Sequence, residues 1–151
     1  MRWHLSTAVP HATLDRGRVW QSEDEMQVTR YVRIYADDRG ESHFADVDVS
    51  LAPVDFAPPA GPLNIAQLFP AAQCFFMGAP HDWGGDVPHP APRRIVTCIL
   101  QGEFEVDVSD GETRRFPPGA VALLEDTTGK GHRTRNVGAE PVLIFGVALA
   151  D

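Results

Sequence analysis

The sequence predicts an all-β protein built from two sheets folded together. Three observations favour this class: no stretch sustains a helical period, β-rich runs of five to eight residues recur, and turns rich in Gly, Pro and Asp-Gly separate these runs at short intervals. The chain has 151 residues, which is one domain by length and enough to bury a core without disulfides.

The amino-acid composition limits which partners the protein can bind and which cellular compartment suits it. The formal net charge of -8 argues against nucleic acid and against an anionic membrane surface. Cys74 and Cys98 form no disulfide or metal-finger framework, so a reducing compartment fits. No segment reaches the ~18 apolar residues of a membrane span, and the N-terminus lacks a signal-peptide core. We therefore expect a cytoplasmic protein.

The first 27 residues show neither a strand nor a helix period. We expect residues 1–27 to form an N-terminal arm, either loosely structured or packed on a partner subunit, and residues 28–151 to form a single domain. A natural start at Met26 is the alternative.

Two strands open the domain, over residues 28–35 and 42–49, with the turn Asp37–Gly40 between them. Alternation places Phe44 with Asp46 and Asp48 on one face of the second strand, and the apolar set of Ala45, Val47 and Val49 on the other. His43 falls with the apolar set. For this histidine a hydrogen-bonded edge position is favoured over a metal ligand.

A proline-rich connection follows, with short strands expected over residues 63–69 and 72–77. Residues 81–92 form a Gly- and Pro-rich loop that delivers polar side chains to the next strand. That strand, residues 95–100, is expected to form a hairpin with residues 104–108 around Gln101-Gly102.

The remaining strands are predicted from short β-rich runs between turn signals. Those runs are residues 113–116, 120–124, 132–136 and 141–149. In the third of them, His132, Thr134 and Asn136 share one face.

This order of strands and turns resembles the cupin superfamily. The second cupin motif, G-x5-P-x-G-x2-H-x3-N, is matched at Gly119, Gly129, His132 and Asn136, with two extra residues before Thr127, which stands where the proline would be. The first motif, counted back from Gly102, places its histidine pair on His89 and Ala91 and its glutamate on Ile95. The segments HPAPR (residues 89–93) and EDTTGKGH (residues 125–132) resemble segments found in a family of small single-domain bacterial cupins. The reaction of that family is not settled.

The resemblance implies a double-stranded β-helix, or jelly-roll, barrel. It also implies a divalent metal, Fe, Mn, Ni or Zn, held by three histidines and a carboxylate. Here His89 and His132 remain, and His81, Glu125 or Asp126 would have to complete the site from loops. The alternative is that His89 and His132 are neutral pocket histidines, hydrogen-bonded to loop carboxylates.

A metal-free chemistry is also open. His132 would act as general acid or base, with Glu125 or Asp126 orienting it, and an arginine would bind a carboxylate. If Ile95 and Thr97 face the lumen, alternation turns Arg93 inward and Arg94 outward. Trp83 and Phe76 are candidate walls of the pocket. Thr97 and Lys130 are candidate substrate-binding residues. Lys130 is alternatively an ordinary solvent-exposed lysine of its loop.

The first functional hypothesis is an enzyme, an isomerase, lyase or oxygenase, acting on a compact anionic substrate between His89, Arg93 and His132. The second is a binding or sensing module that works without metal. A purely structural role is disfavoured because a lumen lined by His, Thr and Arg is a costly core. Apolar outer faces predict a homodimer in which strands or the N-terminal arm cross to the partner.

Overall fold

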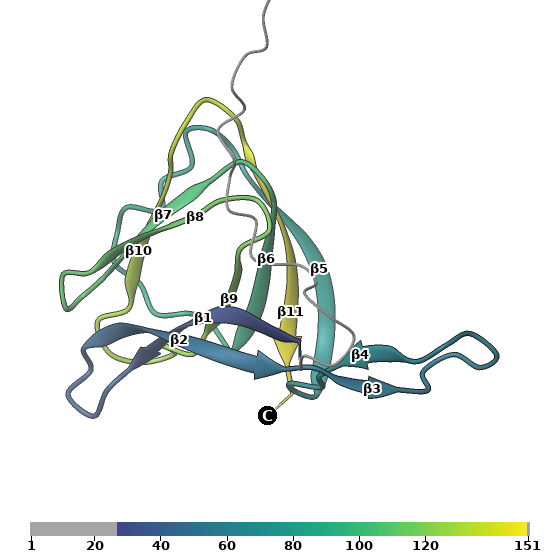
Figure 1. Cartoon of the computed structure of the whole chain (residues 1–151). Coiled ribbons are helices and arrows are strands. Elements are labelled where there is room, and N and C mark those ends of the chain that lie inside the picture. Colours follow the sequence, from purple (N-terminus) through teal and green to yellow (C-terminus); the bar gives the residue numbers. More distant parts are fainter. Residues whose placement is uncertain (1–26, 151) are drawn as a thin grey trace, which may run out of the picture.

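The computed structural model describes residues 27–150, and within that range it contains eleven strands and no helix. The all-β prediction is therefore confirmed (Figure 1). The predicted arm lies, apart from Gln27, outside the described residues. The strands are β1 (Val28–Ala36), β2 (Ser42–Ser50), β3 (Ala52–Val54), β4 (Leu63–Ile65), β5 (Ala71–Ala79), β6 (Ile95–Gln101), β7 (Phe104–Val108), β8 (Thr113–Phe116), β9 (Val121–Leu124), β10 (His132–Asn136) and β11 (Val142–Leu149).

Two sheets enclose the core of the molecule. The larger has the order β2-β1-β9-β6-β11-β5, and the smaller has the order β10-β7-β8. All pairs are antiparallel except β1 with β9. The side chains between the sheets include Ile34, Phe44, Ile99, Phe104, Val106, Val108, Phe116, Val142 and Ile144. This is the jelly-roll arrangement expected of the chain.

The β1–β2 pair forms as predicted, with Val28 opposite Ser50 and Ala36 opposite Ser42. The face assignment of β2 was wrong in one respect. Phe44 is 8% exposed and packs on Phe116 with ring centroids 6.1 Å apart, so the inward face of β2 is the face of Phe44. Asp46 shares that face but lies further along the strand, where it is exposed.

The predicted hairpin over residues 95–108 does not form. β6 pairs with β9 and β11 in the large sheet, whereas β7 pairs with β8 and β10 in the small one. Gly102 lies at the point where the chain passes from one sheet to the other, with φ of 71°. A Cβ there would lie 2.7 Å from the carbonyl oxygen of Pro141, so the crossing requires glycine. Local sequence predicted both strands correctly but could not predict their partners.

The proline-rich connection contains a short two-stranded hairpin. β3 includes Pro53 and was not predicted, and β4 is shorter than the expected 63–69. β3 and β4 pair only with each other and project from the body of the molecule (Figure 1). β5, longer than the expected 72–77, follows as the edge strand of the large sheet. Among residues 27–150 no helix has the length and apolar character of a membrane span.

Candidate functional site

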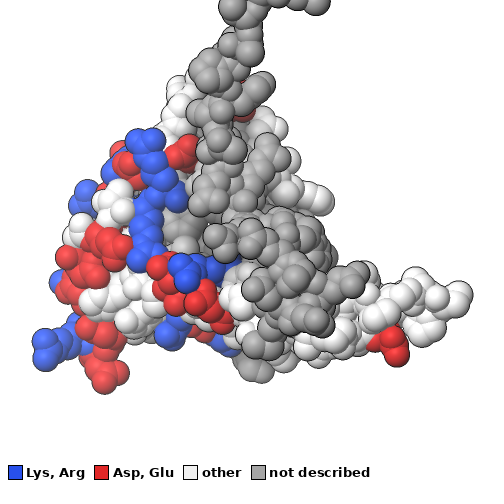
Figure 2. Space-filling view, in the orientation of Figure 1, with Lys and Arg blue, Asp and Glu red and all other residues white. Residues whose placement is uncertain are grey.

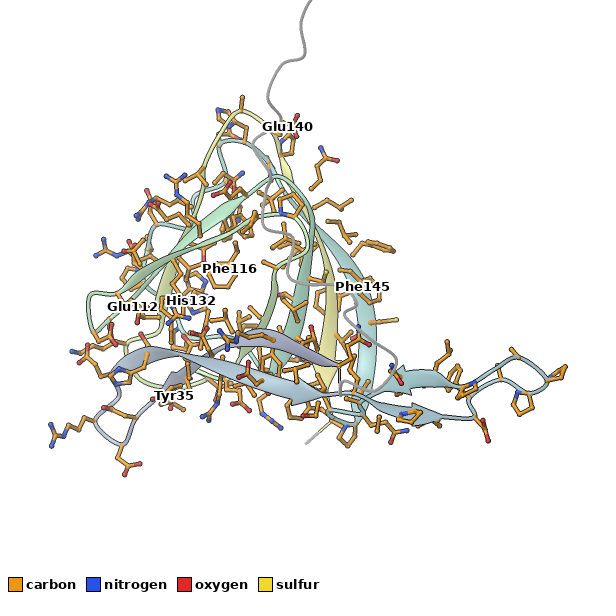
Figure 3. The ribbon with its side chains drawn as sticks, in the orientation of Figure 1. Tyr35, Glu112, Phe116, His132, Glu140 and Phe145 are labelled. Atoms are coloured by element: carbon orange, nitrogen blue, oxygen red, sulfur yellow. The ribbon has the colours of Figure 1, made fainter. Side chains whose placement is uncertain are left out.

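A cavity of about 230 Å³ lies between the two sheets. Its lining is mostly aliphatic and aromatic and comes from both sheets, with Ile34, Ile99, Phe104 and Ile144 among the apolar members. Histidine and threonine side chains supply most of its polar atoms, at His89, Thr97, His132 and Thr134. Figure 3 shows His132 and Phe116 between the sheets and Phe145 at the large sheet. Apolar walls with a few polar groups are typical of small-molecule sites.

Backbone pairing brings the two cavity histidines together. The amide of His89 donates to the carbonyl of His132 at 3.0 Å, and the amide of His132 donates back at 3.1 Å. The ring centroids of the two imidazoles are 5.1 Å apart. Both residues were predicted to share one site, and the structure brings them into contact.

Gly131 makes this pairing sterically feasible. A Cβ at this position would lie 2.1 Å from the carbonyl carbon of His89, and the residue has φ of +69°. No side chain fits between the two strands here, and the backbone conformation also favours glycine. The glycine directly before His132 therefore fixes how closely the loop of His89 approaches β10.

Each imidazole is oriented through its Nδ1 atom. Nδ1 of His89 lies 2.8 Å from the carbonyl oxygen of Val87, which only accepts, so this nitrogen carries the proton. Nδ1 of His132 lies 2.6 Å from Oδ2 of Asp126, and an ionised carboxylate likewise takes a proton donor as its partner. Among the described residues nothing hydrogen-bonds Nε2 of either ring. Both rings therefore keep a nitrogen available for a molecule in the cavity.

Asp126 is the carboxylate that holds His132. The residue is fully buried, and its backbone oxygen accepts from the amide of Ala91 at 3.0 Å. Its second carboxylate oxygen, Oδ1, is buried without a hydrogen-bond partner among the described residues. A buried carboxylate with only one such bond is costly to the fold, and groups of this kind are often retained at functional sites. Of the two orienting residues that the sequence offered, the structure selects Asp126.

Glu125 points away from the cavity and binds two arginines instead of His132. Its Oε1 accepts from Nη2 of Arg94 at 2.6 Å, and its Oε2 accepts from Nε of Arg33. Burial acts to raise the pKa of Glu125, but the hydrogen bonds from Arg33 and Arg94 together outweigh it and lower that pKa. Glu125 therefore joins β1 to the start of β6 from outside the barrel and does not touch His132, contrary to the catalytic role expected for it.

No arginine of residues 27–150 lines the cavity. Ile95 and Thr97 do line it, as the alternation argument required, but Arg93 is exposed and Arg94 is bound to Glu125. The prediction that Arg93 faces inward was wrong because alternation holds only inside a strand, and β6 begins at Ile95.

Two further predicted residues also lie outside the cavity lining. Nζ of Lys130 forms an ion pair with Glu41 at 2.5 Å, and His81 is exposed on its loop. The solvated-lysine interpretation of Lys130 fits this position. His81 is accordingly not placed to complete a metal site with His89 and His132.

Of the two predicted aromatic walls, only one lines the cavity. Trp83 does so and packs against Phe104 with ring centroids 5.9 Å apart and ring planes tilted by 42°. Phe76 is 69% exposed and contacts Phe145, on the face of β5 that points away from the cavity, so its assignment to the pocket was wrong. Sequence reasoning missed Met77, its neighbour, which does line the cavity. Alternation along a correctly bounded β5 would have identified Met77.

The donor set does not fit the metal centre that the cupin resemblance implies. The four positions carried over from the motifs, His89, Ala91, Ile95 and His132, all line this cavity, but two of them carry aliphatic side chains. Across residues 27–150 no group of three or more His, Cys, Asp or Glu side chains is placed to hold an ion. Metal sites in proteins ordinarily use at least three protein ligands. With His89 and His132 alone, the cavity is short of the protein ligands that such a metal centre needs.

Comparison with known proteins finds likenesses to solved structures. No family model and no curated protein matches the sequence. Among solved structures, the chain is similar to the cupin domain of Schizosaccharomyces pombe Cnp3, at 18% identity and a TM-score of 0.41, over 82% of this chain and 84% of that one. It is also similar to a putative ethanolamine utilization protein Q from Salmonella typhimurium LT2, at 19% identity and a TM-score of 0.37, over 83% and 97% of the two chains. Likenesses this distant do not carry a function over to this chain.

Proposed function

We propose that this chain is a small cupin-type module that binds a compact, largely apolar organic molecule inside the barrel. The polar group of that molecule lies between the imidazoles of His89 and His132. A single observation supports this most strongly: two oriented rings, 5.1 Å apart, line a cavity of about 230 Å³ whose other walls are mainly apolar. Apolar walls supply affinity by burial, and the two Nε2 atoms fix the orientation of the guest.

The cavity chemistry indicates a weak acid or another hydrogen-bond donor as the guest. With Nδ1 of His89 held by a carbonyl, a neutral ring presents an accepting Nε2, and a protonated ring presents a charged donor. A carboxylic acid, phenol or enol pairs with either form. The anionic ligand expected from the sequence depended on Arg93, which lies outside the lining, so the imidazoles are the groups that would bind an acid.

Ligand screening against matched histidine variants tests this proposal. Small carboxylic acids and phenols, each paired with its methyl ester or ether, would be screened by thermal shift, with affinities then measured by calorimetry. His89→Gln and His132→Gln are each expected to weaken binding of an acid about tenfold or more, because a hydrogen bond to a charged group is lost. His43→Gln is the matched control, since His43 lies on β2 outside the cavity. Unchanged affinity in both cavity variants would refute the site.

Acid–base catalysis at His132 is the second candidate function. The buried Asp126–His132 pair supports it, because a carboxylate that fixes Nδ1 leaves Nε2 to accept or return a proton on a bound molecule. The reaction class would be an isomerisation that moves a proton on a weak carbon acid. Deuterium exchange into the bound ligand, followed by NMR, separates catalysis from binding alone. If the ligand exchanges its proton and His132→Gln abolishes that exchange, the chain is an enzyme. If the ligand binds without any exchange, the chain is a binding module.

A further inference from the structure

We propose that a second copy of this chain covers residues 51–80, giving a two-fold dimer in which each β3–β4 hairpin lies against strand β5 of the partner. This proposal is independent of the cavity and its ligand. It rests on the projecting hairpin, on the edge strand beside it and on the charge of the segment that contains both.

The β3–β4 hairpin presents apolar side chains that its own barrel does not cover. Val54, Phe56 and Leu63 are 43%, 68% and 53% exposed. Among residues 27–150 the two strands pair only with each other, and they extend away from the sheets (Figure 1). An isolated two-stranded hairpin is marginally stable in water at best. A hairpin with this composition therefore gains stability when another surface packs on it.

β5 offers an uncharged edge next to the hairpin. It is the last strand of the large sheet, and its nine residues, AAQCFFMGA, include no Asp, Glu, Lys or Arg. Phe76 at its centre is 69% exposed. At the opposite edge of the same sheet, β2 carries Asp46 and Asp48, and the edge strands of the small sheet, β8 and β10, each carry two arginines. Charge on an edge strand prevents pairing with another chain, and β5 has no such protection.

The charge and size of the whole segment match a protein interface. The chain holds 13 Lys and Arg and 21 Asp and Glu, yet residues 51–80 contain only one of them, Asp55. In Figure 2 the projecting hairpin is nearly all white, whereas blue and red side chains gather over the small sheet and the β1–β2 end. Twenty-four of these thirty residues are exposed. A standard interface uses roughly 20–30 residues per partner and is depleted of charge at its centre.

A second copy fits because one chain carries both halves of the contact. Residues 66–70 alone separate the hairpin from β5 along the chain, and the hairpin leaves the body of the molecule next to one end of β5 (Figure 1). A two-fold axis beside β5 would place the β3–β4 hairpin of each copy against strand β5 of the other. The hairpin and β5 of both copies would then be buried. Such an isologous contact closes on itself and leaves no apolar edge exposed.

Sedimentation velocity on the full-length protein tests the dimer. We expect a species of twice the 16.5 kDa chain mass that dissociates on dilution. Phe56→Lys on the hairpin and Phe76→Lys on β5 should each raise the dissociation constant about tenfold or more, because each places a charge in the buried centre. Val87→Lys is the control, since Val87 is 72% exposed and lies outside residues 51–80. Circular dichroism verifies that all three variants are folded.

Hydrogen exchange at high and low protein concentration separates the remaining outcomes. Slower exchange of residues 52–65 and 71–79 at high concentration supports the proposal. A chain that stays monomeric up to about millimolar concentration overturns the proposal. This holds even if these residues exchange slowly, because another part of the same chain would then be covering them. A dimer that is unaffected by both lysine substitutions also overturns it, because the interface then lies elsewhere.

Discussion

Nδ1 of His132 and Oδ2 of Asp126 lie 2.6 Å apart in the interior of the barrel, and this contact orients the ring that faces the cavity. Asp126→Ala leaves Nδ1 of a buried imidazole without its partner. We expect the free energy of unfolding to fall by about 1–3 kcal/mol, as for other buried polar groups left unpaired. Urea denaturation measures this. Asp126→Asn should lose less, because its side-chain oxygen still accepts from Nδ1, and equal losses in the two variants would contradict the role assigned to this bond.

Gly131→Ala tests the close approach of the two histidine-bearing segments. Gly111→Ala is a matched control: both glycines have positive φ, but a Cβ at Gly111 meets nothing within 4 Å, whereas one at Gly131 meets the backbone of His89. The control should lose about 1–3 kcal/mol from backbone strain alone. Gly131→Ala should lose a further ~1 kcal/mol or more from overpacking. Equal midpoints in urea would show that the backbone of His89 moves away at no cost.

Metal content tests the fit of the donor set. Protein purified without an affinity tag should contain less than about a tenth of an equivalent of any transition metal. The double substitution Ala91→His and Ile95→Glu restores the two donors that the cupin resemblance implies, at positions that line the cavity. This variant should take up about one equivalent of zinc or manganese by elemental analysis. Stoichiometric metal in the unaltered chain would refute the two-histidine description of the site.

Glu125→Gln tests the outer arginine pair. The side chain of Glu125 is 15% exposed and accepts hydrogen bonds from Arg33 and Arg94, which are about 40% exposed. Allowing for solvent screening, we expect a loss of about 1 kcal/mol in the free energy of unfolding. The lowered pKa of Glu125 implies that this stabilisation is present above the unfolded pKa and is lost as pH falls through the folded pKa. Asp48→Asn, which breaks an exposed pair with Arg30, should change stability little.

His43 gives the protein a pH dependence of opposite sign. Its ring nitrogens lie 3.2 Å from Asp37 and 2.7 Å from Asp110, and these hydrogen bonds raise the pKa of His43. The protonated ring therefore stabilises the fold fully below the unfolded value of about 6.5, and this contribution is lost as pH rises through the folded pKa. Urea midpoints at about pH 6 and pH 8.5 should differ more in the unaltered protein than in His43→Gln. An equal difference in both would show that His43 is not the titrating group.

Except for β3, the strands were predictable from local sequence, whereas most of the strand partners were not. The β1–β2 pair follows from alternation and the Asp37–Gly40 turn, which lie within a few residues of each other. The segments β6 and β7 were recognised just as well, but their turn at Gly102 joins two sheets instead of forming a hairpin. Whether a turn closes a hairpin or crosses between sheets depends on which distant strands, here β9, β11, β8 and β10, complete each sheet.

The amino-acid sequence by itself determined the all-β class, the two histidines of the site and the aliphatic residues in place of metal ligands. Only the tertiary structure decided which of the candidate residues act at the cavity: Asp126 contacts His132, whereas neither Arg93 nor Arg94 lines the cavity. Glu125 and Asp126 follow directly after the end of β9, and in the structure Asp126 faces His132 while Glu125 faces Arg33 and Arg94. That choice depends on where a strand begins and ends, and long-range packing fixes those boundaries.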